Sequence, residues 1–403
     1  MAIESMELSP FGHISYCTNI HAGEHWEEVF DKLKQYIPRI KTEVSPDKSF
    51  GIGLRLSDIA SKELLEGNNL TEFVNWMAET DTYVFTMNGF PFGSFHNTVV
   101  KDQVHAPDWI TQARLDYSKR LLFILSQILP QGMSGGVSTN PVGYRHWFKG
   151  QSESEGALEK GASQMLEVAL YLHQLEKETG KYLHLDIEPE PDGFLENSPE
   201  VLDFFQEYLL RLGKPKFQNE LGVSAEEAER LIKRHLTLCY DICHFALAYE
   251  SPEYTLGALK QAGIQVGKVQ VSAALRILFD AEPNKVWQVL EAFDESTYLH
   301  QVTQQTEEGV KTYADLPDLL AHKGDFTELR AHFHVPIFLE RYGLLQSTQD
   351  QIKAVVDYAK THAVSEHWEV ETYTWDVLPA DLKTEMGACI IRELQWLKSE
   401  FES

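Results

Sequence analysis

The sequence predicts an α/β fold, a (β/α)8 barrel of parallel strands with an insertion after its seventh strand. Short β-rich runs alternate with longer helical runs, a pattern typical of parallel strands joined by helical crossovers. Four apolar, β-branched runs end on carboxylate or imidazole side chains: residues 182–190, 236–244, 331–337 and 367–375. Such side chains, spread over half the chain, meet only if their strands lie side by side, and a barrel gathers them at its C-terminal mouth.

Eight β-rich runs fill the eight strand positions of the barrel. In chain order they are residues 13–21, 50–56, 82–88, 132–139, a fifth run ending at Glu188, a sixth ending at Asp241, and residues 266–272 and 368–374. Helical periodicity follows in the intervals, at residues 26–36, 162–178, 199–212, 224–235 and 380–401. Ser57 is placed to cap the helix after the second strand. We therefore expect one barrel domain over residues 1–403.

A ninth run, residues 331–337, also has the composition of a strand. We favour an insertion over residues 273–329, between the late barrel strands, that returns the chain to the mouth through the His332-Phe333-His334 segment. The alternative is that an early run, residues 132–139, is not a barrel strand.

The charge balance narrows the choice of partner. The 403 residues include 35 Lys+Arg and 61 Asp+Glu, which gives a formal net charge of −26. A nucleic-acid-binding protein needs a basic footprint, and an anionic membrane surface also attracts basic segments. We therefore expect a small-molecule substrate and no nucleic acid.

The chain carries no recognisable targeting segment. Its first residues lack the basic and apolar regions of a signal peptide, and no window approaches the ~20 apolar residues of a membrane-spanning helix. Cys17, Cys239, Cys243 and Cys389 fit buried thiols in a reducing compartment, and no second Cys pair completes a zinc knuckle. We expect a cytoplasmic protein.

The strand ends carry the candidate metal ligands. Glu188, Asp241, His334 and Glu371 each lie near the C-terminal end of a predicted strand. Carboxylates and imidazoles suit Mn²⁺, Zn²⁺, Co²⁺ or Mg²⁺, and several buried carboxylates are costly without a cation. The structural alternatives are an ion pair or helix cap by Asp241, and a satisfied core histidine at position 334.

Polar residues at other strand ends are candidates for substrate contact. They are Gln270, His21, Arg55, Asn88 and Asn140, with His96 in the loop after the third strand. Arg55 could hold a phosphate or carboxylate in a bidentate fork. Lumen packing and loop capping are the alternative for each of them.

The set Glu188, Asp241-x-x-His244 and Glu371 resembles the xylose isomerase-like barrels, which include sugar isomerases and ketose 3-epimerases. The resemblance implies that Glu188, Asp241 and Glu371 bind a divalent metal, that Glu188 and Glu371 act as catalytic acid and base, and that His244 contacts the substrate. The chain departs from the pattern at strand seven, where Lys268 and Gln270 stand at the positions of the epimerase His-x-His segment. Either Gln270 substitutes for the metal histidine, or His334 supplies the imidazole.

Five segments, FGHISYCTNIHAGEHW, LHLDIEPEPDG, YDICHFA, HFHVPIF and WEVETYTW, are similar to the EboE-type metabolite traffic proteins over nearly the full length. That resemblance implies handling of a secondary-metabolite precursor. We expect a metal-dependent isomerase or epimerase of a sugar-like or cyclitol-like metabolite. The alternative is a non-catalytic carrier that serves a membrane transport partner, and a homo-oligomer is compatible with either.

Overall fold

Eight parallel strands form the central sheet of the computed structural model, which describes residues 12–93, 96, 99–280, 282–373 and 385–403. Their order is β1-β14-β7-β6-β5-β4-β3-β2, and a parallel bridge between Cys17 and Gly53 joins the two outer strands. The strands are β1 His13–Tyr16, β2 Phe50–Arg55, β3 Thr82–Asn88, β4 Gly135–Thr139, β5 Leu183–Ile187, β6 Leu236–Asp241, β7 Val266–Val271 and β14 His367–Val370. The predicted (β/α)8 barrel is confirmed.

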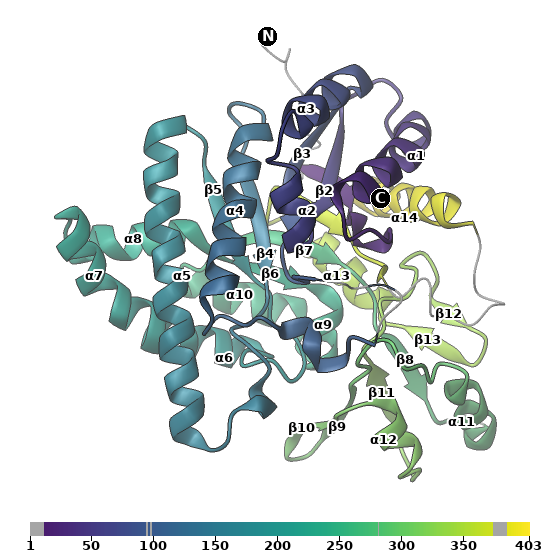
Figure 1. Cartoon of the computed structure of the whole chain (residues 1–403). Coiled ribbons are helices and arrows are strands. Elements are labelled where there is room, and N and C mark those ends of the chain that lie inside the picture. The colour runs from purple at the N-terminus through teal and green to yellow at the C-terminus, as the bar shows by residue number, and fades with distance from the viewer. Residues whose placement is uncertain (1–11, 94–95, 97–98, 281, 374–384) are drawn as a thin grey trace.

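Helices cover the outside of the barrel (Figure 1). They are α1 Trp26–Val44, α2 Asp58–Glu63, α3 Asn69–Thr80, α4 Gln112–Ile128, α5 Gln151–Thr179, α6 Ser198–Asp203, α7 Arg211–Leu221, α8 Ala225–His235, α9 Ile242–Leu247, α10 Pro252–Ala262, α13 Gln349–Ala359 and α14 Met386–Glu402. Ser57 caps α2 as predicted, because its side chain accepts a hydrogen bond from the Ala60 amide. None of the described helices is long and apolar enough to cross a bilayer.

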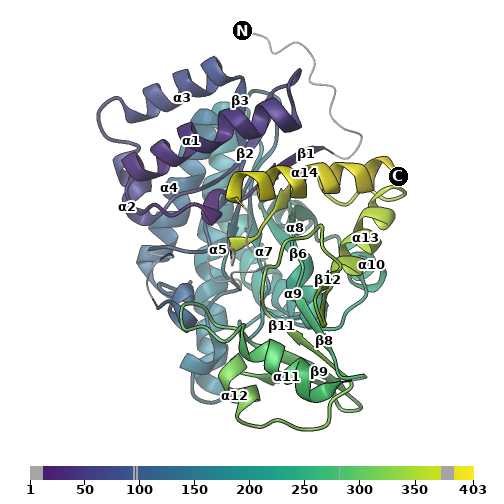
Figure 2. The same ribbon diagram turned by 90° about the vertical axis from the view of Figure 1, so that its right-hand side faces the viewer.

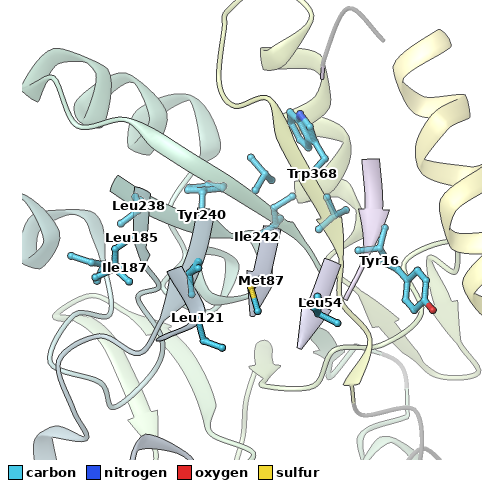
Figure 3. Packing of buried hydrophobic residues seen from close by; sticks show 14 of the residues in the cluster. Tyr16, Leu54, Met87, Leu121, Leu185, Ile187, Leu238, Tyr240, Ile242 and Trp368 are labelled. Carbon is cyan, nitrogen blue, oxygen red and sulfur yellow. The ribbon is translucent and has the colours of Figure 1, made fainter. Parts of the chain in front are cut away.

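The barrel strands are buried on both faces. The side chains on the outer face are apolar, whereas many of those on the lumen face are polar. Leu185 and Ile187 of β5 and Leu238 and Tyr240 of β6 point outward into the apolar layer under the helices (Figure 3). The alternate residues face the lumen, and the close packing there limits side-chain size. A Cβ at Gly53 would collide with the Glu369 carboxylate. Polar groups therefore occupy the lumen in layers, with the last layer at the C-terminal ends of the strands.

An insertion follows β7, as predicted, and forms a second sheet beside the barrel mouth (Figure 2). Its strand order is β10-β9-β11-β8-β13-β12. The elements are β8 Leu275–Leu278, α11 Pro283–Glu291, β9 Val302–Thr306, β10 Gly309–Tyr313, α12 Leu316–Leu320, β11 Glu328–Ala331, β12 Arg341–Tyr342 and β13 Leu345–Ser347. This sheet continues to Ser347, beyond the expected end of the insertion at residue 329.

The strand predicted over residues 331–337 is wrong. β11 ends at Ala331, and the residues after it pair with no strand of either sheet. Instead the Val335 amide donates to the carbonyl of Ala273, just after β7, and Pro336 has no amide hydrogen to continue a ladder. The segment thus crosses the mouth as extended chain.

The sixth strand ends at Asp241, as predicted, and His244 lies in the first turn of α9. Thr374 and Trp375, at the end of the last predicted strand, and residues 380–384 of the last predicted helix lie outside the described residues. The cysteines are buried and unbridged, as expected.

Candidate metal centre

Three acidic side chains from distant parts of the chain converge at the C-terminal mouth. Glu188 follows β5, Asp241 ends β6 and Glu371 follows β14, and each offers a carboxylate oxygen within 4.8 Å of the others. All three are buried, with at most 3% of each residue exposed. The structure therefore brings these predicted ligands together in one place.

Asp241 has one oxygen engaged and one left over. Its Oδ1 accepts hydrogen bonds from Ser272 Oγ at 2.6 Å and from the His244 amide at 3.2 Å, the second of which caps α9. Its Oδ2 is buried with no hydrogen-bond partner among the described residues and lies 3.8 Å from His334 Nε2. The predicted helix cap and the predicted ligand thus use different oxygens of the same carboxylate.

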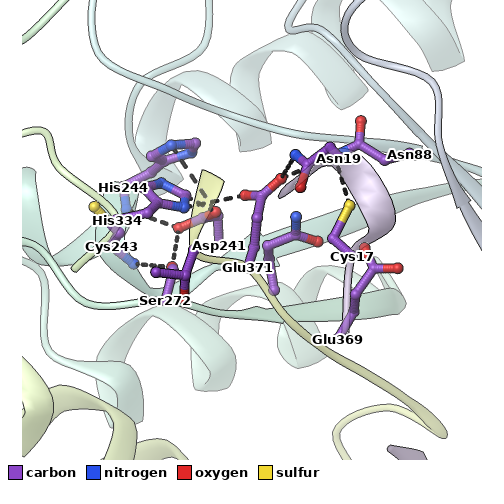
Figure 4. A network of polar contacts seen from close by, with 12 residues as sticks. Cys17, Asn19, Asn88, Asp241, Cys243, His244, Ser272, His334, Glu369 and Glu371 are labelled. Atoms are coloured by element: carbon purple, nitrogen blue, oxygen red, sulfur yellow. Dashed lines mark hydrogen bonds and ion pairs between the residues drawn. The ribbon is translucent and has the colours of Figure 1, made fainter. Parts of the chain in front are cut away.

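Glu371 is held from two sides (Figure 4). Asn19 Nδ2 and Asn88 Nδ2 donate to its Oε1 at 2.6 and 2.9 Å. His334 Nδ1 lies 3.1 Å from its Oε2. Burial alone would raise the pKa of Glu371, but the hydrogen bond and charge of His334 outweigh it and lower that pKa to about 2.

Glu188 has the opposite environment. Burial, followed by the charges of Glu371 and Asp241, raises the pKa of Glu188 well above its ordinary value. Its Oε2 is buried and has no hydrogen-bond partner among the described residues. Several carboxylates that lie this close together and are buried away from water need a cation to offset their repulsion.

His334 reaches the cluster from the insertion rather than from a barrel strand. It is 1% exposed and lies between Asp241 and Glu371. Burial would lower its pKa, but the charge of Asp241 and its contacts with Cys243 and Glu371 raise it well above the usual value. Of the two sequence alternatives for the imidazole, this position favours His334.

Gln270 lies near the end of β7, is fully buried and contributes to the lowering of the Glu371 pKa, but its Nε2 has no hydrogen-bond partner among the described residues. Its Oε1 accepts a weak hydrogen bond from Cys239 Sγ at 3.9 Å. Gln270 does not line the mouth cavity. It therefore supports Glu371 from within the lumen.

The donor set fits a divalent cation. Glu188, Asp241, Glu371 and His334 together offer oxygen and nitrogen atoms in a buried pocket, and two of the carboxylate oxygens have no hydrogen-bond partner among the described residues. Mixed carboxylate and imidazole ligands are typical of Zn²⁺, Mn²⁺ and Co²⁺ sites, and carboxylates also bind Mg²⁺.

One layer deeper in the lumen the charges are paired. Lys268 Nζ donates to Glu369 Oε1 at 2.8 Å and to Ser138 Oγ at 3.0 Å, and both Lys268 and Glu369 are fully buried. Asp186 in the same lumen pairs with a histidine instead: it lies 2.5 Å from His184 Nδ1 and accepts from Thr237.

The predicted substrate residues separate into two groups. Asn88 lines the mouth cavity, and His96 lies at its edge, where its Nε2 is 2.5 Å from the Asn19 carbonyl. His21, Arg55 and Asn140 do not line that cavity. His21 stacks on Tyr36, and Asn140 donates to the His105 carbonyl.

Arg55 is occupied elsewhere. Its guanidinium donates to the carbonyls of Gly23 and Gly93 and lies 3.8 Å from Glu24, away from the mouth cavity. The loops that follow the first and third strands fold back and bind this arginine.

A histidine pair forms the other wall of the site. His244 Nδ1 donates to the Pro189 carbonyl at 2.8 Å, and His332 Nδ1 donates to Gln301 Oε1 at 2.9 Å. Their Nε2 atoms lie 3.1 Å apart, and Glu190 is close enough to share a cation with both. His244 thus faces the cavity beside the carboxylates, where a substrate contact is possible.

Several residues of the site were not selected from the sequence. Glu190, Asn19 and Ser272 could have been found, because each follows a strand by the same rule that identified Glu188 and Asp241. Glu190 is buried and lies 2.7 Å from His105 Nε2. His105 and Gln301 lie in loops with no local pattern that marks them.

The insertion and the loop after β3 enclose the mouth in a cavity of about 60 Å³. Tyr298, Leu299 and Gln301 of the insertion line it together with Lys101 and His105 of the loop. The Val100 amide donates to the carbonyl of Thr297, which ties the two segments together. The cavity is therefore a small, partly open space whose lining includes Glu188 and Glu371 of the acidic cluster.

No family model matches the chain, and no curated protein sequence matches it. Solved structures of similar fold include a D-tagatose 3-epimerase-like protein (10% identity, 97% of each chain covered, TM-score 0.49). A putative sugar phosphate isomerase/epimerase from Anabaena variabilis has 10% identity, with 97% of this chain and 98% of that chain covered and a TM-score of 0.48. A xylose isomerase-like TIM barrel protein from Mycobacterium smegmatis, in complex with magnesium, has 10% identity, with 98% and 100% covered and a TM-score of 0.47. The site itself is interpreted from this chain's own geometry.

Proposed function

We propose that the protein is a metal-dependent isomerase or epimerase of a small sugar-like or cyclitol-like metabolite. The observation that carries the proposal is the convergence of Glu188, Asp241 and Glu371, with His334, at one cavity. Lysine and arginine do not explain this arrangement, since among the described residues neither pairs with any of the three carboxylates.

Glu188, Asp241, His334 and Glu371 would hold the divalent ion. When bound, such an ion supplies Lewis-acid polarisation of a substrate carbonyl or hydroxyl. Glu188 and Glu371 would act as base and acid toward the substrate. One of them removes a proton from the carbon beside the carbonyl, and the other returns a proton to the resulting enediolate. His244 faces the same space and would orient a substrate oxygen. Asn19 and Asn88 hold Glu371 in place through hydrogen bonds to its Oε1.

The finer proposal is that the metabolite is a secondary-metabolite precursor, as the resemblance to EboE-type metabolite traffic proteins implies. The protein would act in the cytoplasm beside a membrane transport partner. A non-catalytic carrier is the second candidate, and the replacement at strand seven favours it. Gln270 stands where the epimerase histidine belongs, and the imidazole comes from the inserted segment instead.

Solvent hydrogen exchange tests the catalytic proposal. Protein loaded with Mn²⁺ or Zn²⁺ is incubated in D₂O with a panel of ketoses, aldoses and cyclitol ketones, and deuterium at carbon is measured by mass spectrometry. We expect exchange into at least one compound, and its loss in Glu188→Gln and Glu371→Gln. Ligand-dependent thermal stabilisation without exchange into any bound compound would reject isomerisation and support the carrier.

A further inference from the structure

We infer that the mouth cavity takes an uncharged, hydroxyl-rich ligand and rejects the phosphorylated form of the same compound. This inference rests on the proposed function for its assumption that the cavity beside the metal centre is the substrate site. It follows from the juxtaposition in that cavity of a neutralised lysine, several buried carboxylates and an amide oxygen that must accept a hydrogen bond.

The charge of the lysine at the mouth is already neutralised. Lys101 is the one lysine or arginine among the described residues that line the cavity. Its Nζ lies 2.6 Å from Asp315 Oδ2 of the insertion and also donates to the Glu295 carbonyl. Arg55, which the sequence offered as a phosphate ligand, is bound to backbone carbonyls outside the cavity. A phosphate would therefore meet no free lysine or arginine among these residues.

Several groups that face the cavity can only accept hydrogen bonds. Asn19 Nδ2 donates to Glu371, which fixes the amide so that Oδ1 can act only as an acceptor. That Oδ1 is buried with no hydrogen-bond partner among the described residues. Glu188 and Glu190 add carboxylate oxygens to the same lining. Hydroxyl groups of a ligand can donate to all of these acceptors, whereas a phosphate dianion has no hydrogen to donate.

The balance of charge points the same way. Glu188, Glu190, Asp241 and Glu371 gather at the mouth, and a divalent ion would offset only part of their charge. Like charges brought together in a dry site are strongly unfavourable. The lining also has an apolar part, formed by Phe90, Val100, Val104 and Leu299, which suits the C–H face of a small ring or chain. The same lining would admit a protonated amine, which the binding assay also tests.

Matched ligand pairs test the inference. With Mn²⁺ present, binding is measured by titration calorimetry for ketoses and cyclitols and for their monophosphates, such as D-fructose with D-fructose 6-phosphate and myo-inositol with its 1-phosphate. We expect at least one neutral member to bind, and its monophosphate to bind about 100-fold more weakly. A monophosphate that binds as tightly as its neutral partner, or preferential binding of an amino analogue over every neutral compound, overturns the inference.

Two variants distinguish a specific effect of the Lys101 charge on phosphate binding from a general effect of net charge. Asp315→Asn removes the charge that neutralises Lys101 but keeps an oxygen for the amides of Leu316 and His300, so it should improve phosphate binding about tenfold. Asp318→Asn removes the same charge from an exposed position of α12 and should leave phosphate binding unchanged. Equal effects of the two variants would contradict the role of Lys101.

The result is independent of turnover. If Mn²⁺ is retained but no neutral compound of the panel binds, the inference fails and the metal centre stands. If wild-type protein does not bind Mn²⁺, the proposed function fails and the inference fails with it.

Discussion

The barrel lumen deals with buried charge in two different ways in successive layers. In the lower layer, Lys268 and Glu369 form a fully buried ion pair 2.8 Å apart. In the layer above, Glu188, Asp241 and Glu371 lie together and have no lysine or arginine partner among the described residues. In the lower layer a lysine of the chain itself compensates the buried carboxylate. At the mouth no described lysine or arginine does so, and the proposed function assigns that charge to a bound ion.

The largest expected effect concerns the lower layer. Lys268→Met leaves the Glu369 charge buried and unpaired, which should lower the free energy of unfolding by about 3–5 kcal/mol. The double variant Lys268→Met with Glu369→Leu should recover most of that loss, because both charges are then absent. Urea denaturation measures both. Equal instability of the single and double variants would show that the ion pair is not the cause.

A buried carboxyl in a third kind of environment sharpens the comparison, because it has neither a lysine partner nor neighbouring acids. Glu393 of α14 accepts hydrogen bonds from Thr372 Oγ1 and the Ile337 amide, and so holds the chain just beyond Glu371 and His334. Burial raises its pKa from 4.5 to about 7. The folded protein therefore keeps a proton that the unfolded chain loses, so stability falls as the pH rises from about 4.5 through 7.

Glu393→Gln should remove this pH-dependent loss, which amounts to about 3 kcal/mol. The measurement is the difference in unfolding free energy between wild type and variant across that pH range. Glu402→Gln, at an exposed position of the same helix, serves as the control and should follow wild type. A wild-type curve parallel to that of Glu393→Gln would contradict the raised pKa.

The two layers should also differ in metal binding. Asp241→Asn removes a charge from the mouth, whereas Glu369→Gln removes one from the layer below. We expect Asp241→Asn to weaken Mn²⁺ or Zn²⁺ binding by more than about 100-fold, since loss of an outer-shell partner alone costs 10- to 100-fold. Glu369→Gln should retain the metal. Elemental analysis after dialysis measures the bound metal, and circular dichroism checks folding. Equal metal loss in both variants would show that the two layers do not differ in metal binding.

The smallest expected effect concerns the hydrogen bond that orients Asp241, one of the proposed metal ligands. Ser272 Oγ donates to Asp241 Oδ1 at 2.6 Å, whereas Ser138 Oγ accepts from Lys268 in the layer below. Ser272→Ala should lower metal affinity about tenfold, because Asp241 loses a hydrogen bond that orients it. Ser138→Ala should leave metal affinity unchanged. Competition with a fluorescent chelator measures both affinities.

The strand ends were predictable because their pattern is local. Alternation along β5 and β14 separates the outward apolar residues from the lumen acids, which is why Glu188, Asp241 and Glu371 could be placed together from the sequence. The insertion after β7 was also predicted. Its path was not, since residues 332–337 resemble a strand but bind the end of β7 through one amide instead of joining a sheet.

Pairings between distant residues could not be predicted. No pattern near Lys268 in the sequence identifies Glu369 as its partner. No pattern near Arg55 indicates that it donates hydrogen bonds to the carbonyls of Gly23 and Gly93. His105 and Gln301 reach the site from irregular loops, where side-chain direction depends on tertiary contacts. Sequence periodicity locates positions on a strand, but it contains no information about loops that fold back over the mouth.

The most direct test of the account is a crystal structure of the protein with Mn²⁺, with anomalous diffraction recorded to locate the ion. The account predicts one strong anomalous peak bound by Glu188, Asp241 and Glu371, with His334 as the nitrogen ligand. A peak elsewhere with this cluster free of metal, or no peak at saturating Mn²⁺, would contradict it.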